Sequence, residues 1–195
     1  LFRSSAASDV YKRQGKKSEI KALKKRDQEI NNFQKNVRKK VITHFAVSND
    51  MNHLPNGLVL LNIVVDIERV GDYTKNILDL AMNHPKKIIA EDISSDLYDI
   101  EQEILERFKK TIHALDNQDQ ESANQLLKTY KSNLATKSDF VVNRCISGED
   151  SFEDSSKTAS VALYARYLKR VGAHLKNITT TIVNPFEDIG YKPPS

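Results

Sequence analysis

A nine-residue segment that occurs twice limits the ways in which this chain can fold. ERVGDYTKN, at residues 68–76, returns 101 residues later as KRVGAHLKN, at residues 169–177. Both copies fall in stretches that favour an amphipathic helix, and no strand-like alternation of apolar and polar residues accompanies either of them. The repeat therefore predicts two related helical halves that pack with pseudo-symmetry.

The rest of the chain is typical of long helices joined by short loops. Hydrophobic residues make up 39% and charged residues 29%, with only 6 Gly, 5 Pro and no Trp, which favours amphipathic helices. Apolar spacing and loop residues predict helices over 16–47, about 56–83, 94–115, about 120–146 and about 157–183. We therefore expect an all-α antiparallel bundle of two similar halves, at residues 16–84 and 94–184. The tail, residues 185–195, has no helical period and is expected to pack loosely.

The first fourteen residues, LFRSSAASDVYKRQ, differ in character from the rest of the chain. They begin without Met and show neither an apolar period nor the apolar core of a signal peptide. They resemble the translation of a sequencing adapter, so we interpret residues 1–14 as a non-native segment. The first half is then expected to lack one helix at its N-terminal end.

Composition also argues against several classes of function. The single cysteine, Cys145, excludes an internal disulfide and fits a cytoplasmic protein. The longest apolar run, residues 58–65, is too short to span a bilayer. Residues 1–47 carry a charge of +9, from 13 Lys/Arg and 4 Asp/Glu, but no aromatic residues are interleaved with them as in nucleic-acid-binding segments, so we expect no nucleic-acid partner. No phosphate loop, HExxH motif or paired nucleophile and base is present, and we therefore expect no enzyme.

The first copy of the repeat places two carboxylates on one face of its helix. Glu68 and Asp72 are four residues apart, and they repel each other unless a cation, a proton or a basic side chain lies between them. Oxygen ligands suit hard cations such as Fe³⁺, Mn²⁺ or Mg²⁺, and Asp27 and Asn31 on the preceding helix are candidates for further ligands. The alternative is that the two acids form ion pairs with Arg38, Arg69 or a lysine of a neighbouring helix, or simply face water.

The second copy keeps the framework of the first but not its acids. Lys169 and Ala173 replace the two carboxylates, so we expect no metal in the second half. The basic and amide residues that both copies share are candidate binding residues: Arg69, Asn76, Arg170 and Asn177. Gly71 and Gly172 lie in helix interiors, where glycine costs roughly 1 kcal/mol relative to alanine, and both therefore predict the close approach of a neighbouring helix.

These two segments resemble the signature helices of PhoU-type phosphate-transport regulators. The resemblance rests on Glu68-Arg69-Val70-Gly71-Asp72 with Asn76-Ile77, on Lys169-Arg170-Val171-Gly172-Ala173-His174 with Asn177-Ile178, and on the helix that precedes the first copy. It covers most of residues 20–184 and implies two three-helix bundles, the first shortened. Family members bind iron-like metals through paired acidic motifs, of which only Glu68 and Asp72 match here, so at most one site is implied.

The resemblance also implies a non-enzymatic role. Such a protein restrains phosphate uptake and phosphate-starvation signalling by contacting a phosphate transporter and a sensor histidine kinase at the inner face of the membrane, and we expect it to form a homo-oligomer. Two alternatives stay open: a cytoplasmic tail of a sodium–phosphate cotransporter, and a purely structural helical dimerisation module. A di-iron carboxylate enzyme is disfavoured, because the Glu-x-x-His pairs that such bundles use do not occur.

Overall fold

The computed structural model describes residues 17–48, 51–83, 94–149 and 155–191, and these residues form helices and connecting turns without any strand. The elements are α2 (Lys17–Lys25), α3 (Asp27–Ser48), η1 (Met51–His53), α4 (Leu54–Asn83), α5 (Ser94–Asn117), α6 (Gln120–Tyr130), the π-helical segment η2 (Lys131–Ala135), α7 (Thr136–Ser147), α8 (Ser155–Val183) and η3 (Phe186–Asp188). The all-α fold class is confirmed. Residues 1–14, which we interpret as non-native, lie outside the described residues.

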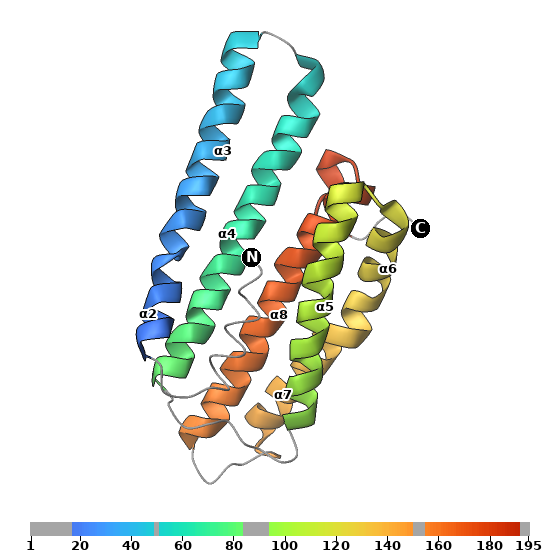
Figure 1. The fold of residues 1–195 in the computed structure, drawn as a ribbon. Helices are drawn as coiled ribbons and strands as arrows, with labels where there is room; N and C mark the ends of the chain where they lie inside the picture. The colour runs from blue at the N-terminus through green and yellow to red at the C-terminus, as the bar shows by residue number, and fades with distance from the viewer. Residues whose placement is uncertain (1–16, 49–50, 84–93, 150–154, 192–195) are drawn as a thin grey trace.

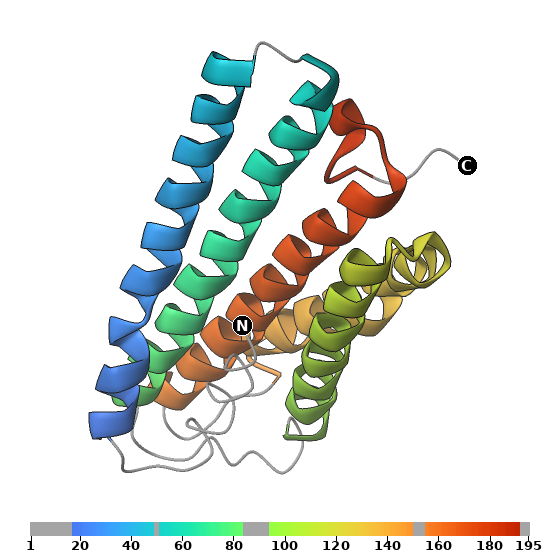
Figure 2. The ribbon, with the colours of Figure 1, turned by 45° about the horizontal axis from the view of Figure 1, so that its top comes forward.

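The helices form two groups that meet along one seam. In the first half α2 and α3 pack against α4, and in the second half α5, α6 and α7 pack around α8. Figure 2 shows α3, α4 and α8 side by side, with α4 in the middle, and α4 and α8 are the most extensively packed pair of the molecule. If α2 with α3, and α6 with η2 and α7, are each taken as one interrupted helix, the first half is a two-helix hairpin and the second a three-helix bundle. The two halves are joined through α4 and α8, the helices that carry the repeat (Figure 1).

The first long helix is interrupted once. The turn falls at Arg26, whose backbone carbonyl accepts a hydrogen bond from the Glu29 N–H at 3.0 Å. α3 then begins with Asp27 and Glu29 in its first turn, where negative charge is favourable because the N-terminal end of a helix carries a partial positive charge. The predicted helix over 16–47 is therefore present as two segments, α2 and α3.

α4 begins slightly earlier than the sequence predicts. It starts at Leu54 rather than near residue 56, with Pro55 in its first turn. Proline is tolerated there because the first N–H groups of a helix have no partner within the helix. α4 ends at Asn83, before the His84-Pro85 pair that predicts its end.

The predicted helix over 120–146 contains a π-helical turn. Its start is capped by Asp119, whose carboxylate accepts hydrogen bonds from the Ser122 backbone N–H at 3.0 Å and hydroxyl at 2.6 Å. These bonds lower the pKa of Asp119. The five residues of η2 then separate α6 from α7, and α7 ends at Gly148, which adopts a left-handed φ of 78° that suits glycine.

The C-terminal segment is held more firmly than the sequence predicts. The Asn184 side chain donates to the Asp188 carbonyl at 2.7 Å, and the Lys176 ammonium donates to the Gly190 carbonyl at 2.8 Å. The Gly190 N–H in turn donates to the Thr180 hydroxyl at 2.7 Å. Hydrogen bonds to α8 thus hold both backbone groups of Gly190, whereas residues 185–187 and Tyr191 are exposed. The loose packing expected of the tail stays a prediction for its other residues.

One apolar core runs through both halves. It includes Val70, Ile77 and Leu78 of α4, Ile100, Ile104 and Phe108 of α5, Val141 of α7, and Val161, Tyr164, Leu168, Val171 and Leu175 of α8. The two halves therefore share a core and fold as one unit rather than as two independent domains. Among the described residues, no helix combines the length and the apolar character needed to cross a bilayer.

Candidate functional site at the seam of the repeated helices

The two copies of the repeat face each other across the seam between α4 and α8. Val70 and the corresponding Val171 are each only 2% exposed and belong to the shared core. Tyr73 occupies the place in the first copy that His174 occupies in the second, and their rings stack with centroids 5.7 Å apart. The pseudo-symmetry axis that the repeat predicts therefore passes between Tyr73 and His174.

Each repeated glycine lies where another helix approaches closely. A Cβ atom on Gly172 would lie 2.0 Å from Leu134 Cδ2 and 3.1 Å from Ile104 Cδ1, and a Cβ atom on Gly71 would lie 3.0 Å from Ile30 Cδ1. The two side chains that approach Gly172 come from two different elements, Leu134 from η2 and Ile104 from α5. The prediction that both glycines mark helix crossings is confirmed.

A buried acid joins the two copies. The Asp66 carboxylate on α4 contacts His174 Nδ1 at 2.7 Å and accepts a hydrogen bond from Asn177 Nδ2 at 3.1 Å. Asp66 and His174 are each 8% exposed. Because a buried carboxylate is costly unless it is paired and hydrogen-bonded, this cluster specifies one register of α4 against α8. The His174 Nε2 atom is buried without a hydrogen-bond partner in the described structure.

Sequence reasoning missed Asp66, although a signal was available. It is the single acid in the apolar stretch LVLLNIVVDI, residues 58–67, and a charged residue in such a stretch is informative because unpaired charges are rarely buried. Asn177 was proposed as a binding residue, and the structure gives it a partner inside the chain. His174 was not singled out as a partner for any acid.

Arg170 completes the polar contacts on the seam. Its Nε donates to the Tyr73 hydroxyl at 3.0 Å, and its guanidinium carbon lies 5.4 Å from the centre of the Tyr73 ring. Tyr73 also packs beside Tyr167, with ring centroids 6.1 Å apart. The structure thus places Arg170, another proposed binding residue, in a contact between α4 and α8.

The acidic face of the first copy is arranged around Arg69. The Arg69 guanidinium lies 3.9 Å from a Glu68 carboxylate oxygen and 3.7 Å from an Asp72 carboxylate oxygen. Arg69 is exposed, and Glu68, Asp72 and Asn76 are partly buried. The structure therefore brings the two predicted acids onto one face, and a basic residue of the same helix contacts both.

Asp27 and Asn31 form a separate contact on the neighbouring helix. Asp27 accepts a hydrogen bond from Lys75 Nζ at 3.3 Å and a long one from Asn31 Nδ2 at 3.4 Å. The Asp27 carboxylate also lies beside Gly71, 3.8 Å from where a Cβ would be. Lys75 therefore supplies the positive charge that faces Asp27.

These residues do not by themselves fit a metal site. Within the described part of the chain, no group of three or more His, Cys, Asp or Glu side chains is placed to hold a metal ion. The positive guanidinium of Arg69 lies 3.9 Å from Glu68 and 3.7 Å from Asp72, where it would repel a cation bound between these two carboxylates. The cation at this position stays a prediction.

The second half has a lysine and an alanine in place of the acidic pair. Lys169, in the place of Glu68, contacts both Asp139 carboxylate oxygens, at 2.5 and 2.6 Å. Arg166 lies 4.0 Å from the same carboxylate. His174 instead faces Asp66, so Lys169 and Arg166 are directed to Asp139 and His174 to the seam.

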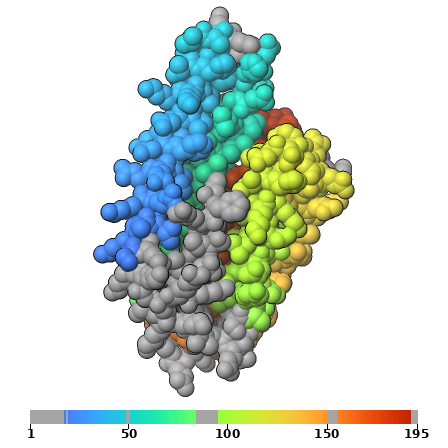
Figure 3. All heavy atoms as spheres, in the orientation of Figure 1, coloured from blue at the N-terminus to red at the C-terminus, as the bar shows by residue number. Residues whose placement is uncertain are grey.

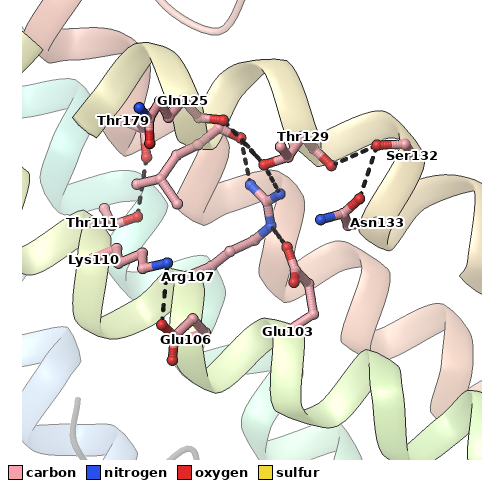
Figure 4. Close-up of polar contacts among 11 residues, drawn as sticks. Glu103, Glu106, Arg107, Lys110, Thr111, Gln125, Thr129, Ser132, Asn133 and Thr179 are labelled. Atoms are coloured by element: carbon pink, nitrogen blue, oxygen red, sulfur yellow. Dashed lines mark hydrogen bonds and ion pairs between the residues drawn. The ribbon is translucent and has the colours of Figure 1, made fainter. Parts of the chain in front are cut away.

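A second buried ionic cluster holds α5 against α6 (Figure 4). Arg107 is 4% exposed; its guanidinium contacts Glu103 at 2.7 Å, and donates to the Leu126 carbonyl at 2.6 Å and to the Thr129 hydroxyl at 2.8 Å. Burial lowers the pKa of Arg107 and raises the pKa of the nearby Tyr130. Sequence reasoning missed this cluster, because Glu103 and Arg107 four residues apart also fit an exposed helix face.

Comparison with known proteins agrees with this architecture. Residues 5–81 match the family model described as the PhoU domain. The crystal structure of PhoU from Pseudomonas aeruginosa superposes with a TM-score of 0.81 at 16% sequence identity, over 93% of this chain and 88% of that chain. No curated protein matches the chain. The resemblance to PhoU is therefore confirmed: residues 5–81 are similar to the PhoU domain, and nearly the whole chain shares the fold of PhoU from Pseudomonas aeruginosa.

Proposed function

We propose that this chain is a non-enzymatic regulator of phosphate homeostasis that works in the cytoplasm. It restrains phosphate uptake and phosphate-starvation signalling through protein–protein contacts with components of a phosphate transporter and with a sensor histidine kinase, and it acts as a homo-oligomer. The observation that carries this proposal is the PhoU-domain match at residues 5–81 together with the PhoU fold.

The arrangement of side chains on the seam supports a role in binding rather than in catalysis. The repeated residues Arg170 and Asn177 are used in contacts between α4 and α8. Helical spacing puts the acidic face around Glu68 and Asp72 on the side of α4 that is turned away from the seam, and this face is partly exposed. A rigid, internally paired seam that supports a charged face is suited to presenting a surface to another protein.

A reporter assay tests the proposal. The chain is expressed in a bacterium that lacks its own PhoU and carries a reporter under a phosphate-starvation promoter. We expect the reporter to be repressed at high phosphate, and we expect co-purification to recover the transporter's ATPase subunit or the sensor kinase. A folded, well-expressed chain that neither lowers the reporter signal nor recovers either protein would contradict the proposal.

A hard cation such as iron at Glu68 and Asp72 is an optional part of the proposal, with its own measurement. Elemental analysis of protein purified without a histidine tag tests it: about one metal ion per chain, lost in the Glu68→Ala/Asp72→Ala variant, would support a site that further ligands complete. Asp27→Ala and Asn31→Ala report whether the neighbouring helix supplies ligands. A folded protein without bound metal would leave Glu68 and Asp72 as partners of Arg69 alone.

A further inference from the structure

A row of basic side chains lies on one face of α8. Helical spacing places these residues around Ala173: Arg166, Lys169, Arg170 and Lys176. All four, like Ala173 itself, are at least partly exposed. Positive charge is therefore concentrated on a part of α8 that solvent reaches.

This row faces away from α5. Ile104 and Thr111 of α5 approach α8 at Gly172 and Thr179, respectively. Those two positions are seven residues apart and mark the side of α8 that α5 covers. In the view of Figure 3, little of α8 is visible between α4 and α5. Ala173 follows Gly172, so its side chain points about 100° further round the helix, away from α5.

Tyr130 of α6 borders the row. Lys176 Nζ lies 6.0 Å from the centre of the Tyr130 ring, and the positive charges of Arg170 and Arg166 act on the Tyr130 hydroxyl. Burial raises the pKa of Tyr130, so at neutral pH this hydroxyl is protonated and can donate a hydrogen bond. Its oxygen reaches solvent, and within the described part of the chain it has no hydrogen-bond partner.

Two of the four basic residues have no carboxylate partner. Lys169 and Arg166 share Asp139, at 2.5 and 4.0 Å. Arg170 donates through Nε to a tyrosine hydroxyl, and Lys176 donates to a backbone carbonyl. No carboxylate of the described residues contacts either of these two. Four positive charges and one negative charge give this face a net charge of +3.

The equivalent face of the first half is neutralised. Arg69 and Lys75 correspond to the two unpaired basic residues of α8, and each of them contacts a carboxylate. Asp72 supplies negative charge at the centre of that face, and Ala173 takes its place in α8. The substitution removes a group that would repel an anion, and it leaves more room at the centre of the basic row.

The two arginines of the row are spaced to hold one anion together. Arg166 and Arg170 are four residues apart, a spacing at which like charges on a helix repel each other. The Nη groups of Arg170 make no hydrogen bond to the described residues, and the Arg166 side chain is 54% exposed. A guanidinium presents parallel N–H donors that match two oxygens of a phosphate-like group. An anion between the two guanidinium groups would replace their repulsion by attraction.

We propose that these residues form a site for a tetrahedral oxyanion with at least two negative charges, such as phosphate or sulfate. The anion lies over Ala173, where the guanidinium groups of Arg166 and Arg170 donate hydrogen bonds to it. The Tyr130 hydroxyl donates a further hydrogen bond, and the two lysines of the row add positive charge. A free phosphate ion and the phosphoryl group of a small molecule both supply this chemistry.

Anion binding at this site goes beyond the proposed function and does not rest on it, because it depends on side chains of this chain alone. A chain that binds phosphate or sulfate without repressing the reporter would contradict the proposed function and support the anion site. A chain that represses the reporter without binding either ion would contradict the anion site and support the proposed function.

Nuclear magnetic resonance titrations of the isotope-labelled whole chain, followed at the Arg Nε–H signals, test the proposal with inorganic phosphate, sulfate and O-phosphoserine at constant ionic strength. We expect saturable binding with a Kd on the order of 1 mM or tighter, as two or three charge-assisted hydrogen bonds provide. Perchlorate has the shape of sulfate but a single charge, and it is expected to bind at least tenfold more weakly. Tighter binding of phosphate than of O-phosphoserine would support a free ion as the ligand, and the reverse order a phosphoryl group.

Variants of the protein locate the site. Ala173→Asp restores the carboxylate of the first half at the centre of the row and is expected to weaken sulfate binding at least tenfold. Ala46→Asp makes the same change at an exposed position of α3 and, as the matched control, is expected to leave binding unchanged. Arg166→Gln and Tyr130→Phe each remove one donor and are expected to weaken binding by about tenfold or less. Circular dichroism checks that each variant is folded.

Four results would overturn the proposal. They are no saturable binding of phosphate or sulfate, binding that neither Ala173→Asp nor Arg166→Gln changes, equal binding of sulfate and perchlorate, and binding of polyglutamate or of anionic lipid vesicles without binding of phosphate or sulfate. The third result would show a general effect of charge. The fourth would assign this face of α8 to an acidic protein or to a membrane surface.

Discussion

The hairpin of the first half and the three-helix bundle of the second half carry the same repeat but bury it to different extents. α8, which carries the second copy, has thirteen buried residues, and α4, which carries the first copy, has five. Gly172 is enclosed by side chains from two other segments, whereas Gly71 meets side chains of α3. The repeated residues therefore specify a helix crossing, and the number of neighbouring helices decides how much stability each crossing contributes.

The largest expected difference concerns the side chains that cover the two glycines. Leu134→Ala removes a fully buried side chain from a closed site and is expected to lower the free energy of unfolding by about 2–5 kcal/mol. Ile30→Ala is expected to cost roughly 1–2 kcal/mol, because Ile30 is partly exposed and the site can relax. Urea denaturation of both variants measures the difference, and equal losses would show that the two halves bury their crossings alike.

The next largest difference in stability is expected between variants of a buried acid, Asp66, and of a partly exposed acid, Asp27. Asp66→Ala leaves Asn177 and His174 without their shared partner inside the seam and is expected to cost about 1–3 kcal/mol. Asp27→Ala removes a more exposed contact with Lys75 and is expected to cost about 1 kcal/mol or less. Thermal unfolding followed by circular dichroism ranks the two variants. An Asp66→Ala protein as stable as the parent would show that the contacts of Asp66 with His174 and Asn177 do not fix the register of α4 against α8.

Replacing each of the two glycines by alanine is expected to change the free energy of unfolding in opposite directions. Gly172→Ala places a methyl group against the buried Leu134 and Ile104 and is expected to destabilise by about 1–2 kcal/mol after the gain in helix propensity. Gly71→Ala meets the end of the Ile30 side chain at 3.0 Å, which can shift, so the propensity gain of up to about 1 kcal/mol is expected to dominate. Chemical denaturation of the two variants in parallel measures both changes in the free energy of unfolding. Changes in the same direction would show that the two helix crossings are equally tight.

The smallest effects are expected from the ion pairs that lie nearer the surface. Lys169→Ala breaks the contact with Asp139, and Lys75→Ala breaks the contact with Asp27. Both pairs are partly solvated, so each variant is expected to lose less than about 1 kcal/mol. The loss is expected to shrink in about 0.5 M salt for both. A loss above about 2 kcal/mol for Lys169→Ala alone would show that the second half depends on this pair for more than local charge balance.

Sequence patterns predicted most of the helices because their signals are local. The helix ends at Asn83 and Ser147 follow from the His-Pro pair and from Gly148, which act within one turn of the chain. Sequence patterns did not predict the interruptions at Arg26 and in the π-helical segment η2. Neither Pro nor Gly marks these two places in the sequence, so the signals that end the other helices are absent there.

The candidate site was predicted only in part. The sequence placed Glu68 and Asp72 on one face and both glycines at crossings, since those relations follow from helical spacing. It did not predict that Asp66 would meet His174 and Asn177, which are more than one hundred residues away. Nor did it reveal the partners of Arg107, because the spacing of Glu103 and Arg107 is the same in an exposed and in a buried pair.

The all-α class, the two related halves and the acidic face that the second copy lacks can all be read from the sequence, because each depends on residue types at fixed spacing along one helix. The tertiary structure is needed to know which polar residues become internal partners. Those outcomes depend on which helices meet. Asp66 is paired because α8 brings His174 to it, and Arg107 is paired because α6 brings the Leu126 carbonyl and the Thr129 hydroxyl to it.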